Sequence, residues 1–276
     1  MTSLKEKRVN NYQIVLPKSD KKKEEKWKGQ DLFDVRWFVM GIIGKRKSGK
    51  TSLIYTLLKA FSRRNTKVIF FVPTFWKDAS YEQIRQFCES KNIGFSNFGS
   101  IVDEGVNNLS IMMKIFEDTP PEGENKEQPP DVSKHLSITP ISSDPADREA
   151  RPEDFEYIFV FDDISTELRD KALQKLVKNS RHYKAKIIIS SQGATDLHPN
   201  LFSQMDYLCL FKNLNTDSLK HIFDKIEPNI DYEEFVKIYF QITESKDDRG
   251  LNSFMLIDRS RNEIRKNLDK VVHLEN

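Results

Sequence analysis

Residues 44–51 read Gly-Lys-Arg-Lys-Ser-Gly-Lys-Thr, and no other stretch of the chain limits its architecture as tightly. The stretch matches the phosphate-loop pattern, which is a glycine, four variable residues and then Gly-Lys-Ser/Thr, without a gap. An apolar run from Trp37 to Ile43 precedes it and predicts a buried strand, and apolar residues at helical spacing from Leu53 to Phe61 follow it. A phosphate loop requires this order of strand, loop and helix, so the sequence predicts an α/β domain that binds nucleotide phosphates.

The loop can hold a triphosphate through its backbone and two of its side chains. Glycines let the chain fold tightly, so that several N–H groups point at the phosphates, and the N-terminus of the next helix adds partial positive charge. We expect Lys50 to reach the β- and γ-phosphates and the Thr51 hydroxyl to ligate Mg²⁺. The predicted nucleotide-binding residues are Gly44, Lys45, Arg46, Lys47, Ser48, Gly49, Lys50, Thr51 and Ser52.

Two consecutive acids, Asp162 and Asp163, end a second apolar run, Tyr157–Phe161. In phosphate-loop sites a carboxylate at a strand end holds Mg²⁺, and we assign this role to Asp162. Asp163 is the candidate general base, which would take a proton from the attacking water. Without the phosphate loop, the two acids would be interpreted as helix caps at a strand–helix junction.

Gln192 follows another apolar strand, Ile187–Ile189, after two serines. Ligands of open α/β sheets gather at the carboxyl ends of strands, so Gln192 is expected to sense the γ-phosphate or to hold the lytic water. An amide in a surface loop is the alternative interpretation.

Arg181 lies in a basic stretch between the helix expected after Asp163 and the strand that ends near Gln192. Phosphoryl transfer profits from an added cation, often supplied by a neighbouring subunit, and Arg181 is our candidate for it. A DNA-facing basic loop and a solvated face are the two competing interpretations of the same residues.

The remaining patterns predict the rest of the domain. Further strands are expected at 68–72, 207–211 and 253–258, and helices at 81–90, 109–116, 219–226 and 232–240. Another helix is expected over 168–176, capped by Ser165 or Thr166. Buried strands that alternate with helices predict a mostly parallel sheet with helices on both faces.

Composition sets the expected domain boundaries. Residues 1–30 are polar and rich in Lys and are expected to be a flexible arm, which leaves an ATPase domain at 31–276. Seven of the eleven prolines lie in residues 119–154, and such a Pro-rich polar stretch cannot bury enough apolar surface to fold, so we expect a mobile insertion there.

Net charge, cysteine content and the length of the apolar runs bear on the partner, the redox compartment and membrane insertion. The net charge of +2 neither requires nor excludes a nucleic-acid partner. Cys88 and Cys209 both lie among apolar residues and are expected to be buried free thiols, which indicates a reducing compartment. No apolar run approaches about 18 residues, so no membrane span is predicted.

Four segments together resemble the poxvirus-type DNA-packaging ATPases of the FtsK–HerA superfamily, found in nucleocytoplasmic large DNA viruses, virophages and related large transposons. The matching segments are Gly44–Thr51, Phe161-Asp162-Asp163, Arg181-His182 and Gln192, with further similarity at Val72-Pro73-Thr74 and from Pro199 to Phe211. The resemblance covers roughly Trp37 to Lys212, without the Pro-rich insertion.

The resemblance implies a RecA-like sheet, in which an extra strand between the phosphate-loop strand and the Asp162 strand brings Gln192 beside the γ-phosphate. It also implies hydrolysis of ATP with Mg²⁺, coupled to translocation of duplex DNA that packages a viral genome. By the same resemblance the chain would form a homo-oligomeric ring, meet capsid or portal-vertex proteins, and work at the assembly site in the host cytoplasm or in the virion.

Two departures from the family pattern bear on the catalytic residues. Relatives often carry an Arg shortly after the proline that matches Pro199, whereas Asn-Leu-Phe-Ser-Gln follows here, so Arg181 must serve or the mechanism differs. The second acid is Asp163 where many ATPases have Glu.

Other nucleotide-dependent functions fit the sequence less well. A kinase of nucleosides or nucleotides needs an Arg-rich lid, and the insertion at 119–154 holds few arginines. A GTP-driven switch needs an Asn/Thr-Lys-x-Asp segment, which neither Lys212–Asn215 nor Asn267–Lys270 supplies. A cellular or plasmid-type HerA-like DNA pump remains an alternative within the same superfamily, and a dead, non-catalytic loop is disfavoured by the intact lysine and acids.

Overall fold

A nine-stranded sheet forms the centre of the computed structural model, which describes residues 26–118, 155–246 and 252–272. Its strands are β1 (Val39–Ile43), β2 (Thr66–Phe71), β3 (Gly94–Phe98), β6 (Glu156–Asp162), β7 (Ala185–Ser191), β8 (Tyr207–Leu210), β9 (Met255–Asp258), β10 (Glu263–Lys266) and β11 (Lys270–Val271). A separate hairpin pairs β4 (Val102–Asp103) with β5 (Val106–Asn107). The helices are α1 (Lys50–Phe61), α2 (Ala79–Ser90), α3 (Asn108–Asp118), α4 (Lys171–Lys178), α5 (Pro199–Gln204), α6 (Thr216–Ile226) and α7 (Tyr232–Thr243).

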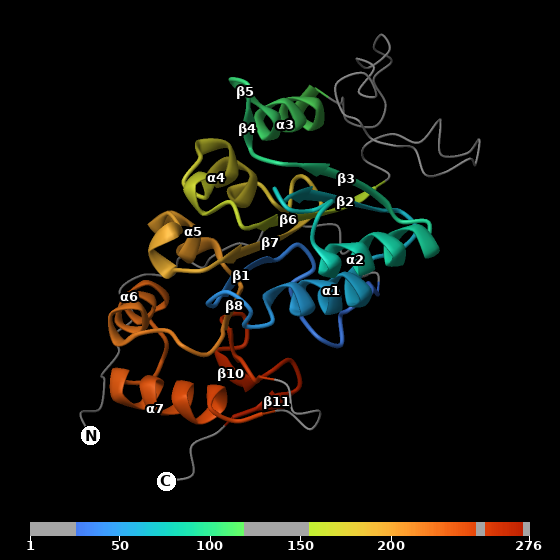
Figure 1. The fold of residues 1–276 in the computed structure, drawn as a ribbon. Helices are drawn as coiled ribbons and strands as arrows, with labels where there is room; N and C mark the ends of the chain where they lie inside the picture. The colour runs from blue at the N-terminus through green and yellow to red at the C-terminus, as the bar shows by residue number, and fades with distance from the viewer. Residues whose placement is uncertain (1–25, 119–154, 247–251, 273–276) are drawn as a thin grey trace, which may run out of the picture.

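The strand order is β11-β10-β9-β8-β1-β7-β6-β2-β3, and the six strands from β8 to β3 run parallel. Strand β7 therefore lies between β1 and β6, which is the extra strand that the resemblance implied. Every residue of β1, β6 and β7 is buried, because helices cover both faces of the sheet (Figure 1). The expected α/β fold with a mostly parallel sheet is confirmed.

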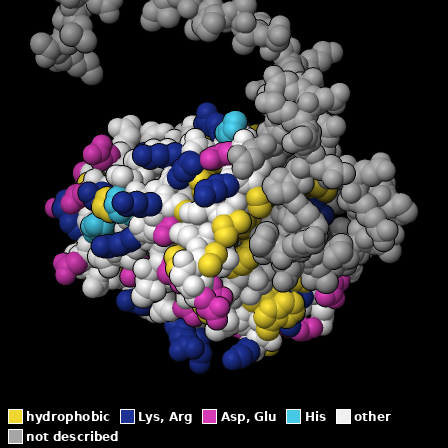
Figure 2. Space-filling model, turned by 90° about the horizontal axis from the view of Figure 1, so that it is seen from above, with side chains coloured by type: hydrophobic (Ala, Val, Ile, Leu, Met, Phe, Trp, Pro, Cys, Tyr) yellow, Lys and Arg dark blue, Asp and Glu magenta, His cyan; other side chains and the backbone are white. Residues whose placement is uncertain are grey.

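Two hydrophobic clusters hold the layers together. Helices α1 and α2 cover one face with apolar side chains such as Leu57 and Ile84, and α3 to α7 pack on the other with side chains such as Leu109 and Leu173 (Figure 1). Figure 2, seen from above Figure 1, shows Lys and Arg side chains close together on the left half of the outer face, with single acidic side chains between them. Helix α4 contributes three exposed lysines at 171, 175 and 178.

Several predicted details need correction. The helix expected over 168–176 begins only at Lys171, and its cap is Asp170, whose Oδ1 accepts from the Ala172 N–H at 2.7 Å. Ser165 and Thr166 instead belong to a separate 3-10 turn. Two further strands that the sequence did not predict, β10 and β11, follow the strand expected at 253–258 and continue the sheet in antiparallel order.

The ends of the predicted domains also change. Residues 1–25 and the insertion at 119–154 lie outside the described residues. Residues 26–30 of the predicted arm pack on the domain: Trp27 is buried against Phe61, and the Lys28 amine donates to the carbonyls of Lys59 and Ser62 at 2.9 and 2.7 Å. The packed domain therefore begins before residue 31.

Two smaller expectations concern the thiols and the membrane. Cys88 and Cys209 are free and buried, as predicted. Within the described ranges, no helix combines the length and the apolar character that crossing a membrane would need.

Candidate functional site

The carboxyl ends of β1, β7 and β6 meet at one edge of the sheet. Ile43 pairs with Ser191, and Asp162 pairs with Ser190, so the three strands end level with one another. The chain leaves β1 as the phosphate loop, β7 toward Gln192 and β6 toward Asp163. The sequence-predicted residues from three separate segments are thereby brought to the same edge.

The phosphate loop depends on glycine at two positions. The Gly44 N–H donates to the Ser191 carbonyl at 3.1 Å, and a Cβ at Gly44 would lie 2.6 Å from Cβ of Phe211 and 2.7 Å from Oγ of Ser48. Gly49 has φ 110°, a left-handed conformation that other residues rarely adopt. A side chain at either position would open the loop.

Lys50 folds back over the loop that precedes it. Its Nζ donates to the carbonyls of Gly44 at 2.7 Å and Lys45 at 3.2 Å. Burial lowers the pKa of Lys50, and the charges of Asp162 and Asp163 oppose that lowering. The ammonium group thus faces both acids across the site, and in the described structure no ion pair joins it to either of them.

Asp162 is a buried carboxylate whose hydrogen-bond partner comes from a helix outside the predicted motifs. The Tyr81 hydroxyl, on α2, donates to Oδ2 of Asp162 at 2.7 Å. Burial raises the pKa of the Asp162 carboxyl, and this rise is opposed by hydroxyl hydrogen bonds, including that of Tyr81, and by the charge of Lys50. Burial and the neighbouring carboxylate raise the pKa of Tyr81, so its hydroxyl stays protonated as a donor.

Asp163 and Gln192 form a pair across two strand ends. Gln192 Nε2 donates to Oδ1 of Asp163 at 3.1 Å, and both side chains are exposed. Asp163 has φ 59°, a left-handed conformation that is uncommon for residues other than Gly, Asn and Asp. Asp tolerates this conformation, which ends β6 after Asp162 and turns the chain out of the sheet.

The residues at this edge fit a magnesium-bound triphosphate. Ser48 Oγ, inside the loop, is buried and has no hydrogen-bond partner among the described residues, as expected of a polar group that a ligand would satisfy. The Thr51 hydroxyl, at the start of α1, and the Asp162 carboxylate are oxygen ligands of the kind that Mg²⁺ prefers. The phosphate-binding role of the loop and the metal-binding roles of Thr51 and Asp162 stay predictions that these residue types fit.

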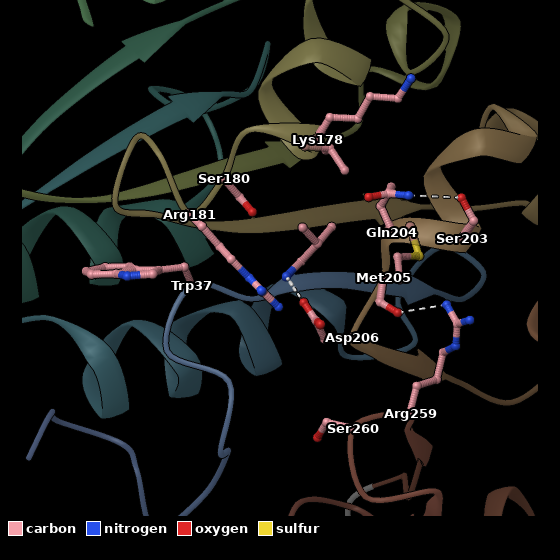
Figure 3. Close-up of a pocket in the computed structure, with 12 residues that line it drawn as sticks. Trp37, Lys178, Ser180, Arg181, Ser203, Gln204, Met205, Asp206, Arg259 and Ser260 are labelled. Atoms are coloured by element: carbon pink, nitrogen blue, oxygen red, sulfur yellow. Dashed lines mark hydrogen bonds between the residues drawn. The ribbon is translucent and has the colours of Figure 1, made fainter. Parts of the chain in front are cut away.

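Arg181 lies at the amino ends of the parallel strands, opposite the carboxyl ends where the phosphate loop is. It precedes β7, whereas Gln192 follows it, and a seven-residue strand spans about 20 Å. There Arg181 lines a cavity of about 520 Å³ with Trp37, Asp206 and Arg259, and its side chain extends toward Asp206 (Figure 3). Arg181 is therefore far from the phosphate loop of its own chain.

Hydrogen bonds to backbone groups hold the walls of this cavity. Asp206 Oδ2 accepts from the Val39 N–H at 2.9 Å, and Arg259 donates to the carbonyls of Phe202 and Met205 at 2.8 and 3.0 Å. Burial raises the pKa of the Asp206 carboxyl, and the Val39 hydrogen bond and the charge of Arg181 oppose that rise, so Arg181 acts on an acid of its own chain.

Comparisons with known proteins agree with this architecture. No protein-family model matches the sequence. The crystal structure of B204, the DNA-packaging ATPase from Sulfolobus Turreted Icosahedral Virus, matches with a TM-score of 0.51 and 18% identity, over 86% of this chain and 98% of that one. This chain has the fold of a viral DNA-packaging ATPase. The expected resemblance is thus confirmed at the level of the fold.

Two further relatives complete the comparison. The cytoplasmic domain of the type VII secretion ATPase EccC from Thermomonospora curvata matches with a TM-score of 0.46 and 14% identity, over 86% of this chain and 26% of that one. An uncharacterized protein, 075L, of Invertebrate iridescent virus 6 is 32% identical over 90 residues. That match spans 31% of this chain and 35% of the viral protein.

Proposed function

We propose that this chain is an ATPase that uses ATP and Mg²⁺ to move duplex DNA into a viral capsid. The observation that carries the proposal is the meeting of Lys50, Asp162 and the Asp163–Gln192 pair at one sheet edge. The fold shared with a DNA-packaging ATPase supports duplex DNA as the molecule that is translocated.

Binding of the triphosphate falls to the loop. The N–H groups of residues 44–51 and the Lys50 ammonium bind the phosphates, and the helix N-terminus favours their negative charge. The Thr51 hydroxyl and Asp162 hold the metal ion. When bound, Mg²⁺ neutralises charge that develops on the phosphate oxygens.

We assign the cleavage of ATP to the acid–amide pair, Asp163 and Gln192. A water molecule attacks the γ-phosphorus, a new P–O bond forms, and the bond to the β–γ bridging oxygen breaks. The water's proton passes to Asp163, whose Oδ1 is held by Gln192 while Oδ2 stays available to accept it. ADP and phosphate leave as products.

The position of Arg181 favours a role between subunits. Because it lies at the edge opposite its own phosphate loop, it can assist only the nucleotide of another copy. Head-to-tail contacts generate a ring when the rotation between subunits closes, and we propose such a homo-oligomeric ring, with Arg181 supplied to the neighbouring site.

The remaining partners follow from the same proposal. The lysines of α4 would contact DNA phosphates, which gives binding that depends on salt and ignores base sequence. Capsid or portal-vertex proteins would receive the ring, at the assembly site in the host cytoplasm or in the virion.

ATP hydrolysis with and without duplex DNA, beside a mass measurement of the assembly, tests the proposal. We expect DNA to stimulate hydrolysis in the oligomer, equally for unrelated sequences and less at higher salt. Absence of hydrolysis by the assembled wild-type chain would refute the ATPase. Hydrolysis that DNA leaves unchanged would refute the translocase while keeping the ATPase.

A further inference from the structure

The short hairpin of β4 and β5 lies beyond the carboxyl end of β3, outside the main sheet. Its two strands are joined by a turn of two residues, Glu104 and Gly105. Both residues have positive φ, 46° and 79°, as in the type I′ turn that suits a tight hairpin. In Figure 1 the hairpin is at the top, beside α3 and above α4. The turn therefore gives this small element a defined shape.

Side chains that follow β6 fix the base of the hairpin. The Glu167 carboxylate accepts hydrogen bonds from the N–H groups of Ile101 and Val102, the latter at 3.1 Å. Asn107 Nδ2 donates to Oδ2 of Asp170 at 3.2 Å. Glu167 belongs to the 3-10 turn after β6, so the hairpin is fixed to the same edge of the sheet as the candidate catalytic residues.

The tip of the hairpin is exposed and combines apolar with acidic side chains. Val102 and Val106 are 44% and 47% exposed, and the acids Asp103 and Glu104 lie between them in the chain. Val102 pairs with Asn107 and Val106 pairs with Asp103, so the two valines lie on opposite faces of the hairpin. Among the described residues, no ion pair involves either acid. A cavity, unlike a flat surface, can cover both valines at once.

The cavity around Arg181, at the amino ends of the strands, has an apolar inner wall. Three of the residues that line it, Val39, Val177 and Met205, are each 2% exposed. Its volume of about 520 Å³ lies within the range of about 300–1,000 Å³ that is usual for small-molecule sites. A two-residue turn with its flanking side chains is no larger than such a ligand, so it can enter this cavity.

The charges of the same cavity favour an acidic partner. Among the described residues, three cations line it, Lys178, Arg181 and Arg259, together with a single acid, Asp206. Figure 3 shows Arg181 and Arg259 on opposite sides of Asp206. The excess of positive charge is the electrostatic complement of a hairpin tip that carries two carboxylates.

We propose that the tip of the β4–β5 hairpin of one copy docks into the Arg181 cavity of the next copy. The hairpin lies at the carboxyl ends of the parallel strands and the cavity at their amino ends. Each chain can therefore offer its hairpin to one neighbour and its cavity to another, which is the head-to-tail contact that a ring requires. The inference rests on the proposed ring and deepens it, because docking brings the neighbour's Arg181 to the edge where Asp163 lies.

The test reverses one charge on each surface of the full-length chain and measures assembly by sedimentation velocity. Glu104→Lys changes the hairpin tip and Lys178→Glu changes the cavity, and both side chains are exposed, so the fold should be kept. Glu89→Lys, exposed on α2 outside both surfaces, is the matched control. The samples contain Mg²⁺ and a non-hydrolysable ATP analogue but no DNA, so contacts of Lys178 with DNA do not contribute.

We expect each single reversal to raise the protein concentration needed for assembly at least about tenfold, because attraction between unlike charges becomes repulsion between like charges. The variant with both changes should assemble nearly like the wild type, since unlike charges meet again. The two positions lie at opposite edges of one chain, so this recovery can come only from contact between copies. The control should assemble normally.

Two results would overturn the inference while keeping the ring. One is normal assembly of either single variant, and the other is a double variant that assembles no better than the single ones. A wild-type chain that stays monomeric under the same conditions would refute the proposed ring and this contact with it. Loss of hydrolysis by an assembled wild type would instead refute the ATPase and leave the docking of the hairpin in place.

Discussion

Glu156 and Asp162 stand at the two ends of strand β6, and each is 7% exposed. Glu156 is paired with two cations: its Oε2 lies 3.0 Å from the Lys186 amine and its Oε1 lies 2.6 Å from the Arg36 guanidinium. Burial alone would raise the pKa of Glu156, but Lys186 and Arg36 outweigh it and the pKa is lowered. Asp162 accepts a hydrogen bond from a neutral phenol, that of Tyr81, and burial raises its pKa.

The difference separates a structural charge from one kept for a ligand. At the start of β6, side chains of the protein itself satisfy the carboxylate of Glu156. At its end a buried acid and the Lys50 ammonium face each other without pairing, an arrangement that costs stability in the absence of a ligand. Such uncompensated charge in a cleft is typical of binding and catalytic sites.

We expect the largest effects from replacing the lysines beside the two acids of β6, which are Lys50 near Asp162 and Lys186 near Glu156. Lys50→Ala should lower the hydrolysis rate by at least about 10²-fold, because a cation at the transferred phosphate is removed, and should leave the fold intact. Lys186→Met should instead cost about 3–5 kcal/mol of unfolding free energy, because it leaves Glu156 buried with one cation fewer. Steady-state hydrolysis and urea denaturation of both variants measure the two effects, and the same response in both variants would abolish the contrast.

The acid–amide pair should show a purely kinetic effect. Asp163→Asn should slow cleavage by about 10²–10⁴-fold, the usual contribution of a general base, while ATP stays bound. Single-turnover hydrolysis, beside the affinity for ATP, checks this. Gln192→Ala should show a smaller loss of the same kind, since it only frees Oδ1 of Asp163. Normal turnover by Asp163→Asn would remove this acid from the role of base.

The two acids of β6 should respond to pH with opposite signs. The folded pKa of Glu156 is lowered, so its contribution to stability is present above its unfolded pKa of about 4.3 and is lost as the pH falls through the folded value. The folded pKa of Asp162 is raised, so its penalty is present at neutral pH and disappears as the pH falls below its unfolded value of about 3.9.

Denaturation of Glu156→Gln and Asp162→Asn at several pH values sharpens this comparison. At neutral pH Glu156→Gln should be less stable than the wild type and Asp162→Asn more stable, and both differences should shrink in acid. Asp162→Asn should also lose Mg²⁺-dependent binding of ATP. A destabilised Asp162→Asn variant with normal binding would show that both ends of β6 serve the fold.

The smallest effect belongs to the phenol that holds Asp162. Tyr81→Phe keeps the buried ring and removes the donor at 2.7 Å, so the carboxylate is less firmly oriented. Groups that orient a metal ligand typically change metal affinity by about tenfold or more, and we expect the Mg²⁺ needed for ATP binding to rise by about that factor. Titration of Mg²⁺ at fixed ATP measures it, with metal-free nucleotide binding as the control that should not change.

The sequence predicted the central strands of the sheet better than the strands at its margin. The central strands were predictable because β1, β6 and β7 are buried on both faces and contain the apolar runs Val39–Ile43, Tyr157–Phe161 and Ile187–Ile189. Strands β10 and β11 were not, because they lie at the sheet's margin, are short and carry charged residues such as Glu263 and Lys270.

The candidate site divides in the same way. Asp163 and Gln192 could be predicted as neighbours because each follows a buried strand, and parallel strands end at a common edge. Tyr81 carries no local signal, since its contact with Asp162 joins residues 81 positions apart. The distance of Arg181 from the loop follows from its place before a strand instead of after it.

A crystal structure of the chain with Mg²⁺ and a non-hydrolysable ATP analogue tests the central claim most directly. We predict the triphosphate within hydrogen-bonding distance of the amides of residues 44–51 and of Lys50, the metal between Thr51 and Asp162, and the γ-phosphate toward Asp163 and Gln192. A nucleotide bound elsewhere, or a phosphate loop that stays without ligand at saturating concentration, would contradict the account.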